Sequence, residues 1–185
     1  MEFASGFVRA DPLRSGSAEM RGMSDFTLLR IPEKEIMKIT VEGSLPKAIG
    51  ITKARLKKAA EHFASLSSAR IGIPFQEVAV VLQDDDFSAE VHEAVNGVAG
   101  PTDAVTQCYD PMPGEADGVY GEVYVNCDRA LAAAPKRRGW SPAKELLLYV
   151  AHGMDHLSGA DDHAPEDYRR MRRRELAWIK SLGRV

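Results

Sequence analysis

Residues 146–163 read LLLYVAHGMDHLSGADDH, and this stretch decides the fold of the chain. The apolar run that opens it leads directly into His152 and His156. Histidines four residues apart lie on one face of an α-helix, about 6 Å apart along its axis, so both rings can reach one cation. Gly159 can adopt the left-handed conformation that ends a helix. The stretch therefore predicts a buried helix followed by a turn back toward the two rings.

This helix is a candidate metal site. Two histidines at this spacing most often lie on a surface, but buried polar rings need partners, and a cation supplies one. Asp161, Asp162 and His163 all follow the turn within reach of the rings. Three protein ligands with one open position describe a catalytic zinc site, whereas a structural site has four. We therefore expect one Zn²⁺ per chain, with manganese, iron or nickel as alternatives if a carboxylate is the third ligand.

The remaining pattern predicts an α+β fold. Apolar periodicity and turn residues indicate strands at 36–41, 78–82, 104–109 and 119–125, and helices at 52–67, at 86–97, from 142 and from 165. The strands come early and helices bracket them. We expect a small mixed β-sheet of about four strands packed against helices, one of which carries the metal site.

Composition limits the domain organisation and the location. With 44% hydrophobic residues in 185, the chain can form one packed domain, expected at 25–185, while residues 1–24 lack periodicity and are expected to be a disordered tail. No apolar stretch approaches the ~20 residues needed to cross a bilayer, and no export signal is recognisable. We expect a cytoplasmic protein without a membrane partner. Cys108 and Cys127 are too few for a disulfide framework and are expected to be buried thiols.

The positively charged residues are concentrated in two segments of the sequence, although the net charge of the chain is −3. A loop carries residues 136–138, Lys-Arg-Arg, and the last predicted helix carries Arg169, Arg170, Arg172, Arg173 and Arg174. These arginines could simply solvate the outer face of the helix, or they could bind phosphates within an otherwise acidic protein. Aromatic residues are only 7%, and no RNA-recognition signature indicates base stacking.

Three segments resemble one known family. His152–Asp162 is similar to the pattern His-Gly-x-Leu-His-Leu-x-Gly-Tyr-Asp-His, Gly97–Thr106 to Gly-x-x-x-Pro-Thr-Asp-Val-Leu-Ser, and Gly121–Val125 to Gly-Asp-Ile-x-Ile. Met171 and Glu175 fit the tail of the same pattern. The segments follow in the right order over residues 36–180. On them the chain is identified as a divergent member of the YbeY family, metal-dependent endoribonucleases of bacterial ribosomal RNA maturation.

The resemblance implies a reaction and its partners. The expected activity is hydrolysis of phosphodiesters in single-stranded RNA by a metal-activated water, in maturation of small-subunit ribosomal RNA and ribosome quality control, with the small ribosomal subunit as partner. Thr102 is implied to line the cleft. Arg169, Arg170 and Arg173 on the last helix could hold the RNA backbone if they face the site.

The resemblance also selects among the candidate ligands. The third histidine of the family falls on Asp162, and His163 lies one residue late, so we predict His152, His156 and Asp162 as ligands, with His163 as the alternative third ligand. A carboxylate leaves the centre one unit less positive, which makes the bound water a weaker acid. Asp161 matches the aspartate of the family and is predicted to orient a ligand.

Two further departures concern catalysis. The family carries an arginine at the position of Asn96, which cannot supply a cation. Asp155 replaces a leucine and could be a general base or the partner of a nearby side chain. The candidate catalytic residues are therefore Asn96, Thr102, Asp155 and Asp161.

Two other functions stay open. A zinc peptidase has similar ligand spacing, but such enzymes place a glutamate directly after the first histidine, where this chain has Gly153. The second is a catalytically impaired, metal-containing protein that binds RNA or the ribosome. The departures at Asn96, Asp155 and Asp162 favour it.

Overall fold

The computed structural model describes residues 37–183, so the predicted disordered tail at 1–24 lies outside the described residues. The strands are β1 (Lys38–Gly43), β2 (Phe75–Gln83), β3 (Ala104–Tyr109) and β4 (Val119–Asn126). The helices are α1 (Lys53–Ile71), α2 (Asp85–Asn96), α3 (Cys127–Ala133), α4 (Pro142–Leu157) and α5 (Pro165–Ser181), with short 3-10 turns η1 (Lys47–Ile49) and η2 (Ala134–Lys136).

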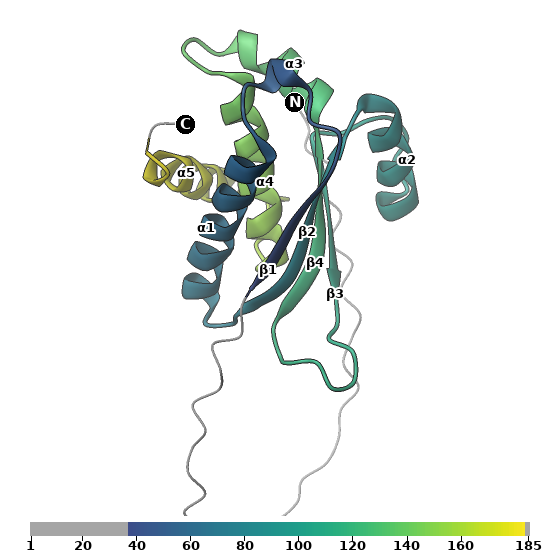
Figure 1. Cartoon of the computed structure of the whole chain (residues 1–185), viewed down its shortest axis with the longest axis vertical. Helices are drawn as coiled ribbons and strands as arrows, with labels where there is room; N and C mark the ends of the chain where they lie inside the picture. The colour runs from purple at the N-terminus through teal and green to yellow at the C-terminus, as the bar shows by residue number, and fades with distance from the viewer. Residues whose placement is uncertain (1–36, 184–185) are drawn as a thin grey trace, which may run out of the picture.

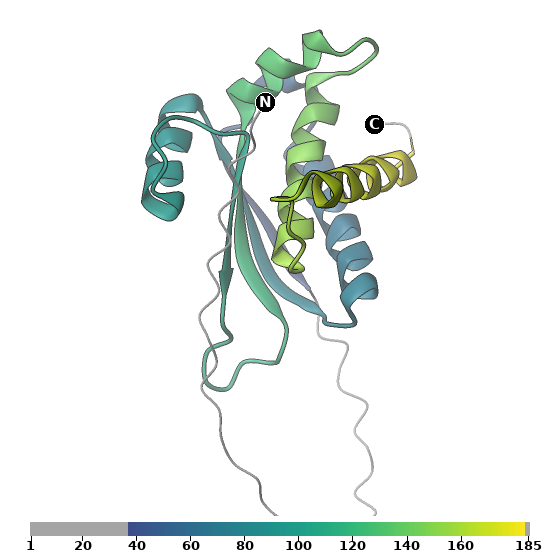
Figure 2. The ribbon, with the colours of Figure 1, turned by 180° about the vertical axis from the view of Figure 1, so that it is seen from behind.

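The four strands form one mixed sheet in the order β1-β2-β4-β3. β1, β2 and β4 run parallel, and β3 pairs antiparallel with β4. Helices α1, α4 and α5 lie on one side of the sheet and α2 on the other (Figures 1 and 2). The predicted α+β fold with a small mixed sheet is confirmed. Among residues 37–183, no helix is both long and apolar enough to cross a bilayer.

Helix α4 is the centre of the core. Every residue from Glu145 to Leu157 is buried, because α4 is enclosed by the sheet, α1 and α5. Alternate residues of β4, among them Val123 and Val125, point toward this helix layer, while the residues between them are only partly buried. The apolar run that precedes His152 in the sequence thus packs in the interior of the protein.

Local signals set the two ends of α4. The Ser141 hydroxyl accepts a hydrogen bond from Lys144 N (3.3 Å), and Pro142 occupies the first turn, where its missing N–H costs nothing. At the other end Gly159 has φ +78°, and its N–H donates to the His156 carbonyl (2.8 Å). The predicted left-handed turn after the second histidine is confirmed.

Some elements differ from the sequence-based expectation. β2 is longer than 78–82, because its ends at Phe75 and Gln83 also pair with β4. Helix α3 was not predicted, since seven residues give too little periodicity to recognise. Cys127 is buried as expected, but the prediction for Cys108 was wrong: it is exposed, because it lies near the end of the edge strand β3.

Two glycines allow α4 to lie close to β4. A Cβ on Gly153 of α4 would lie 2.2 Å from Val123 Cγ1, and one on Gly121 of β4 would lie 2.5 Å from Leu157 Cδ2. Both contacts are far below the ordinary van der Waals separation. The close approach of α4, and therefore of its two histidines, to the sheet depends on the absence of side chains at these two positions.

We expect Gly153→Ala to destabilise the fold by about 1 to 3 kcal/mol, because overpacking outweighs the roughly 1 kcal/mol gain in helix propensity. Urea unfolding midpoints of the variant and the unmodified protein measure this change. Adding Val123→Ala removes the obstructing methyl groups, so the double variant should lose less than the sum of the two single variants. A Gly153→Ala protein as stable as the unmodified one would contradict the close approach.

Candidate metal centre

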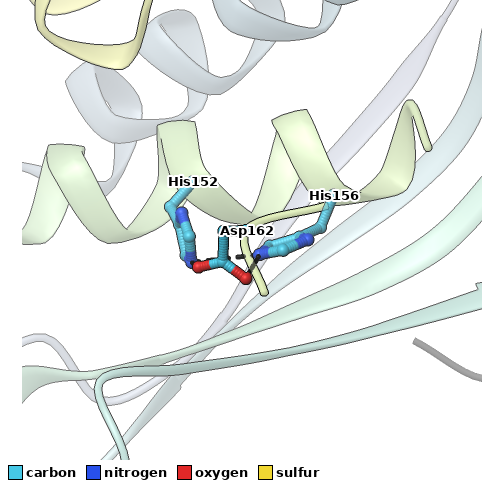
Figure 3. Close-up of side chains that lie close together, drawn as sticks. All are labelled: His152, His156 and Asp162. Carbon is cyan, nitrogen blue, oxygen red and sulfur yellow. Dashed lines mark hydrogen bonds and ion pairs between the residues drawn. The ribbon is translucent and has the colours of Figure 1, made fainter. Parts of the chain in front are cut away.

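His152 and His156 bring their rings together on one face of α4. The ring centroids are 4.4 Å apart, the planes are tilted by 82°, and the two Nε2 atoms are 3.1 Å apart. Both residues are buried. Figure 3 shows the two rings and the Asp162 carboxylate converging beneath the helix.

The hydrogen bonds on the outer ring nitrogens assign the tautomers. Nδ1 of His156 lies 2.9 Å from the Ala160 carbonyl, and Nδ1 of His152 lies 2.7 Å from Glu175 Oε1. Both partners are acceptors, so each Nδ1 carries a proton, and a neutral ring in this tautomer presents a lone pair at Nε2. Burial, reinforced by the nearby His152 ring, lowers the pKa of His156 to about 4, which keeps this imidazole neutral at neutral pH.

Asp162 completes a cluster that suits a metal ion. Its Oδ2 is 3.7 Å from His152 Nε2 and its Oδ1 is 3.7 Å from His156 Nε2. A tetrahedral zinc ion with ligands at about 2.1 Å would separate the ligand atoms by about 3.4 Å, between the 3.1 and 3.7 Å found here. Two lone pairs and a carboxylate facing one another are mutually repulsive without a cation. The donor set therefore fits a three-ligand zinc centre with an open position.

The neighbouring side chains in the same loop form a second group with Asp162, in which one ligand atom from each of Asp161, Asp162 and His163 lies within 4.8 Å of the others. Asp161 and His163 are exposed and pair with each other, and His163 N also donates to Asp161 Oδ1 (3.1 Å). The hydrogen bond from His163 lowers the pKa of Asp161, and the same bond raises that of His163. The ligand rings are oriented by Glu175 and Ala160 rather than by Asp161. This arrangement favours Asp162 over His163 as the third ligand.

Asp155 lies at the junction of three helices. Its side chain is fully buried and forms ion pairs with Arg70 of α1 (3.1 Å from Nη2 to Oδ1) and with Arg174 of α5 (Nε to Oδ2, 2.8 Å). Burial raises the pKa of the Asp155 carboxyl, although Arg174 and Arg70 act in the opposite direction. Of the two predicted roles, the geometry favours the partner of nearby side chains over the general base.

Asn96 and Thr102 lie at the two ends of one loop. Ser88 of α2 holds this loop by donating to the Thr102 carbonyl (3.0 Å) and accepting from Thr102 N (3.1 Å). Asn96 ends α2, and its Oδ1 is buried without a hydrogen bond from any described residue. No hydrogen bond or ion pair in the described part of the chain joins either residue to the histidine cluster, so their catalytic roles stay predictions.

Two acidic residues at the site received no role from the sequence. The first is Glu175, which is fully buried and forms a hydrogen bond with His152. The second is Asp103, whose carboxyl group is influenced by the charges of His152 and of three arginines, Arg129, Arg172 and Arg137. Burial nevertheless raises the pKa of Asp103. A signal for Glu175 was present, because it occupies a position in the apolar stripe of α5 formed by Met171, Trp178 and Ile179. An acidic residue in such a stripe indicates a buried partner.

The arginines of α5 divide between two faces. Arg172 and Arg174 point inward, to Glu175 and Asp155 respectively. Arg169, Arg170 and Arg173 are exposed, and Arg170 pairs with Asp167 on its own helix. The exposed set was the one predicted to contact RNA, and that role stays a prediction.

The fold and the site define an α+β protein whose buried histidine–aspartate cluster is formed by a central helix and the turn that follows it. A family model described as Endoribonuclease YbeY matches residues 44–183. The chain belongs to the YbeY family, which places it among hydrolases that cleave RNA.

Individual sequence relatives agree with this assignment. An endoribonuclease YbeY of Kineococcus radiotolerans is 30% identical over 158 residues, covering 80% of this chain and 89% of the relative. An endoribonuclease YbeY from a Roseiflexus species is 30% identical, covering 75% of this chain and 88% of the relative. An endoribonuclease YbeY from Micrococcus luteus is 41% identical, covering 46% of this chain and 57% of the relative. A solution structure of a Thermotoga maritima protein is similar at a TM-score of 0.47 and 24% identity, covering 78% of this chain and 89% of that one.

We expect Asp155→Asn to lower the free energy of unfolding by about 2 to 3 kcal/mol, because it leaves two guanidinium groups facing no charge. The penalty stays below that of a fully buried pair, since both arginines remain partly exposed. Zinc affinity should be unchanged. Asp167→Asn removes a surface pair and is the control, with a loss below about 1 kcal/mol. A stable Asp155→Asn protein would contradict a structural role for this carboxylate.

Zinc binding distinguishes the candidate third ligands. Asp162→Ala should lower the zinc affinity by at least about 100-fold, because loss of a direct ligand costs no less than loss of an orienting partner. Asp161→Ala and His163→Ala should bind zinc like the unmodified protein. Competition with a chromophoric chelator measures all three. Zinc lost from His163→Ala but kept by Asp162→Ala would overturn the assignment.

Proposed function

We propose that this protein is a metal-dependent endoribonuclease that hydrolyses phosphodiesters in single-stranded RNA. The observation that carries the proposal is the convergence of His152 Nε2, His156 Nε2 and the Asp162 carboxylate in one buried cluster. Three protein ligands leave an open position, as hydrolysis requires. Membership in the YbeY family supports RNA as the substrate.

Each residue of the cluster has a defined task in this proposal. His152, His156 and Asp162 would hold the ion, and a zinc ion bound there supplies an acidified water and positive charge for the phosphate. Glu175 accepts the Nδ1 proton of His152, and the Ala160 carbonyl accepts that of His156. Both bonds fix the rings with Nε2 facing inward and raise their basicity as ligands. Burial of the rings excludes competing water from these positions.

We further propose zinc as the ion and ribosomal RNA of the small subunit as the substrate, in maturation and quality control of the ribosome in the cytoplasm. Support for this pathway comes from the family assignment and from the three sequence segments that resemble the family. Support for zinc comes from the set of two imidazoles and one carboxylate.

Geometry argues against the peptidase alternative. Such an enzyme needs a glutamate directly after the first histidine, and any Cβ at Gly153 would lie 2.2 Å from Val123 Cγ1. Position 153 faces the sheet and cannot present a general base to a substrate.

A second candidate function is an RNA- or ribosome-binding protein with impaired catalysis. The carboxylate of Asp162 lowers the charge of the centre, and Asn96 provides no cation. Both features reduce the electrostatic stabilisation available to a phosphodiester transition state.

We expect the zinc-loaded protein to cleave a labelled single-stranded RNA, and chelation to abolish cleavage because the acidified water is lost. His156→Ala should abolish cleavage for the same reason, whereas His163→Ala should retain it. Gel analysis of the labelled products, with zinc content measured in each sample, provides the test. A zinc-loaded protein that binds this RNA without cleaving it would reject the nuclease proposal and favour the binding protein.

A further inference from the structure

We propose that the RNA backbone is held beside the metal centre by Arg129, Arg137 and Arg172, here called the inner arginines, and not by the exposed arginines of α5. The inference rests on the proposed function, since it specifies how the same site binds its substrate. Each inner arginine comes from a different element, and each is anchored by a carboxylate of the protein.

Arg172 lies one carboxylate away from a metal ligand. Its Nη1 is 3.2 Å from Glu175 Oε2, and the other oxygen of Glu175 bonds to His152. The Arg172 side chain also packs over the ring of Tyr168, 5.4 Å from the ring centroid. These contacts fix a positive charge at the α5 side of the metal centre.

Arg137 lies on the opposite side, toward the start of α4. It follows η2, and its Nη1 is 3.0 Å from Oε2 of Glu145, which is almost fully buried. Glu145 precedes His152 by seven residues, or two helical turns, so it lies on the same face of α4 about 10 Å away. The Arg137 side chain remains 42% exposed and can reach a ligand while anchored.

Arg129 of α3 completes the set. Its Nε is 3.1 Å from Asp85 Oδ1, the same oxygen that accepts a hydrogen bond from the Asn126 side chain. Asn126 N in turn donates to the Asp103 carbonyl (3.0 Å), so α3 is tied to the start of β3. The Arg129 side chain is 40% exposed.

Asp103 lies in the electrostatic field of all three. The charges of Arg129, His152, Arg172 and Arg137 all act on its carboxyl group. Hydrogen bonds and ion pairs connect the inner arginines to this region by separate routes: Arg172 through Glu175 to His152, Arg137 through Glu145 of α4, and Arg129 through Asp85 and Asn126 to the start of β3.

Anchoring makes these arginines better phosphate ligands than mobile ones. A guanidinium group has five N–H donors in a rigid fork, so one edge can bind a carboxylate while another binds phosphate. A side chain already fixed loses less conformational entropy when the ligand arrives. Arg169 and Arg173, by contrast, form no ion pair with another described residue.

The sequence offers matched neighbours for a test. Arg137→Gln is compared with Arg138→Gln, and Arg172→Gln with Arg173→Gln, each as zinc-loaded full-length protein. Affinity for a nuclease-resistant 2′-O-methyl single-stranded oligonucleotide is measured across a series of salt concentrations. Each lost phosphate contact should lower the slope of log K against log salt by about 0.7. We expect this decrease for Arg137→Gln and Arg172→Gln, little change for their neighbours, and a slope largely restored in Arg137→Lys.

Other outcomes overturn the inference. If the slope of log K against log salt decreased equally for both variants of a pair, RNA would be attracted generally to a positive surface. If the slope decreased more for Arg173→Gln than for Arg172→Gln, binding would be assigned to the exposed arginines. Zinc lost from Arg172→Gln would show that Arg172 supports His152 and does not bind phosphate. Because binding is measured without turnover, these results are independent of whether the protein cleaves RNA, which the cleavage assay decides separately.

Discussion

The structure depends on one electrostatic constraint: two imidazole lone pairs and a carboxylate must face one another inside the protein. That arrangement is unfavourable without a cation, so the surrounding contacts have to impose it. Gly153 and Gly121 let α4 approach the sheet, and the turn at Gly159 brings Asp162 back to the rings. Glu175 and Ala160 then fix which nitrogen of each ring points inward.

Features encoded locally could be predicted from the sequence. The position of α4, the shared face of His152 and His156, and the turn at Gly159 all follow from spacing within one short segment. The partners of Asp155 could not be predicted, because Arg70 and Arg174 lie 85 and 19 residues away along the chain. Glu175 was present in a recognised segment, but only tertiary packing brings it to His152.

Charge in this protein is arranged by helix periodicity. At 3.6 residues per turn, Arg172 and Arg174 lie on the two flanks of the buried stripe of α5, and the remaining arginines lie on the outward face. Each buried carboxylate of α4 and α5, namely Glu145, Asp155 and Glu175, has an arginine partner. A run of basic residues that looks uniform in the sequence thus serves two purposes in the folded chain.

The hydrogen bond between His152 and Glu175 has a consequence for the order of assembly. Glu175 follows His152 by 23 residues, so both histidines are synthesised before the carboxylate that orients His152. The adjacent Arg174 must dock at the same time to reach Asp155. All three donors therefore precede α5 in the chain, but the His152 ring gains the partner that orients it only when α5 packs onto α4.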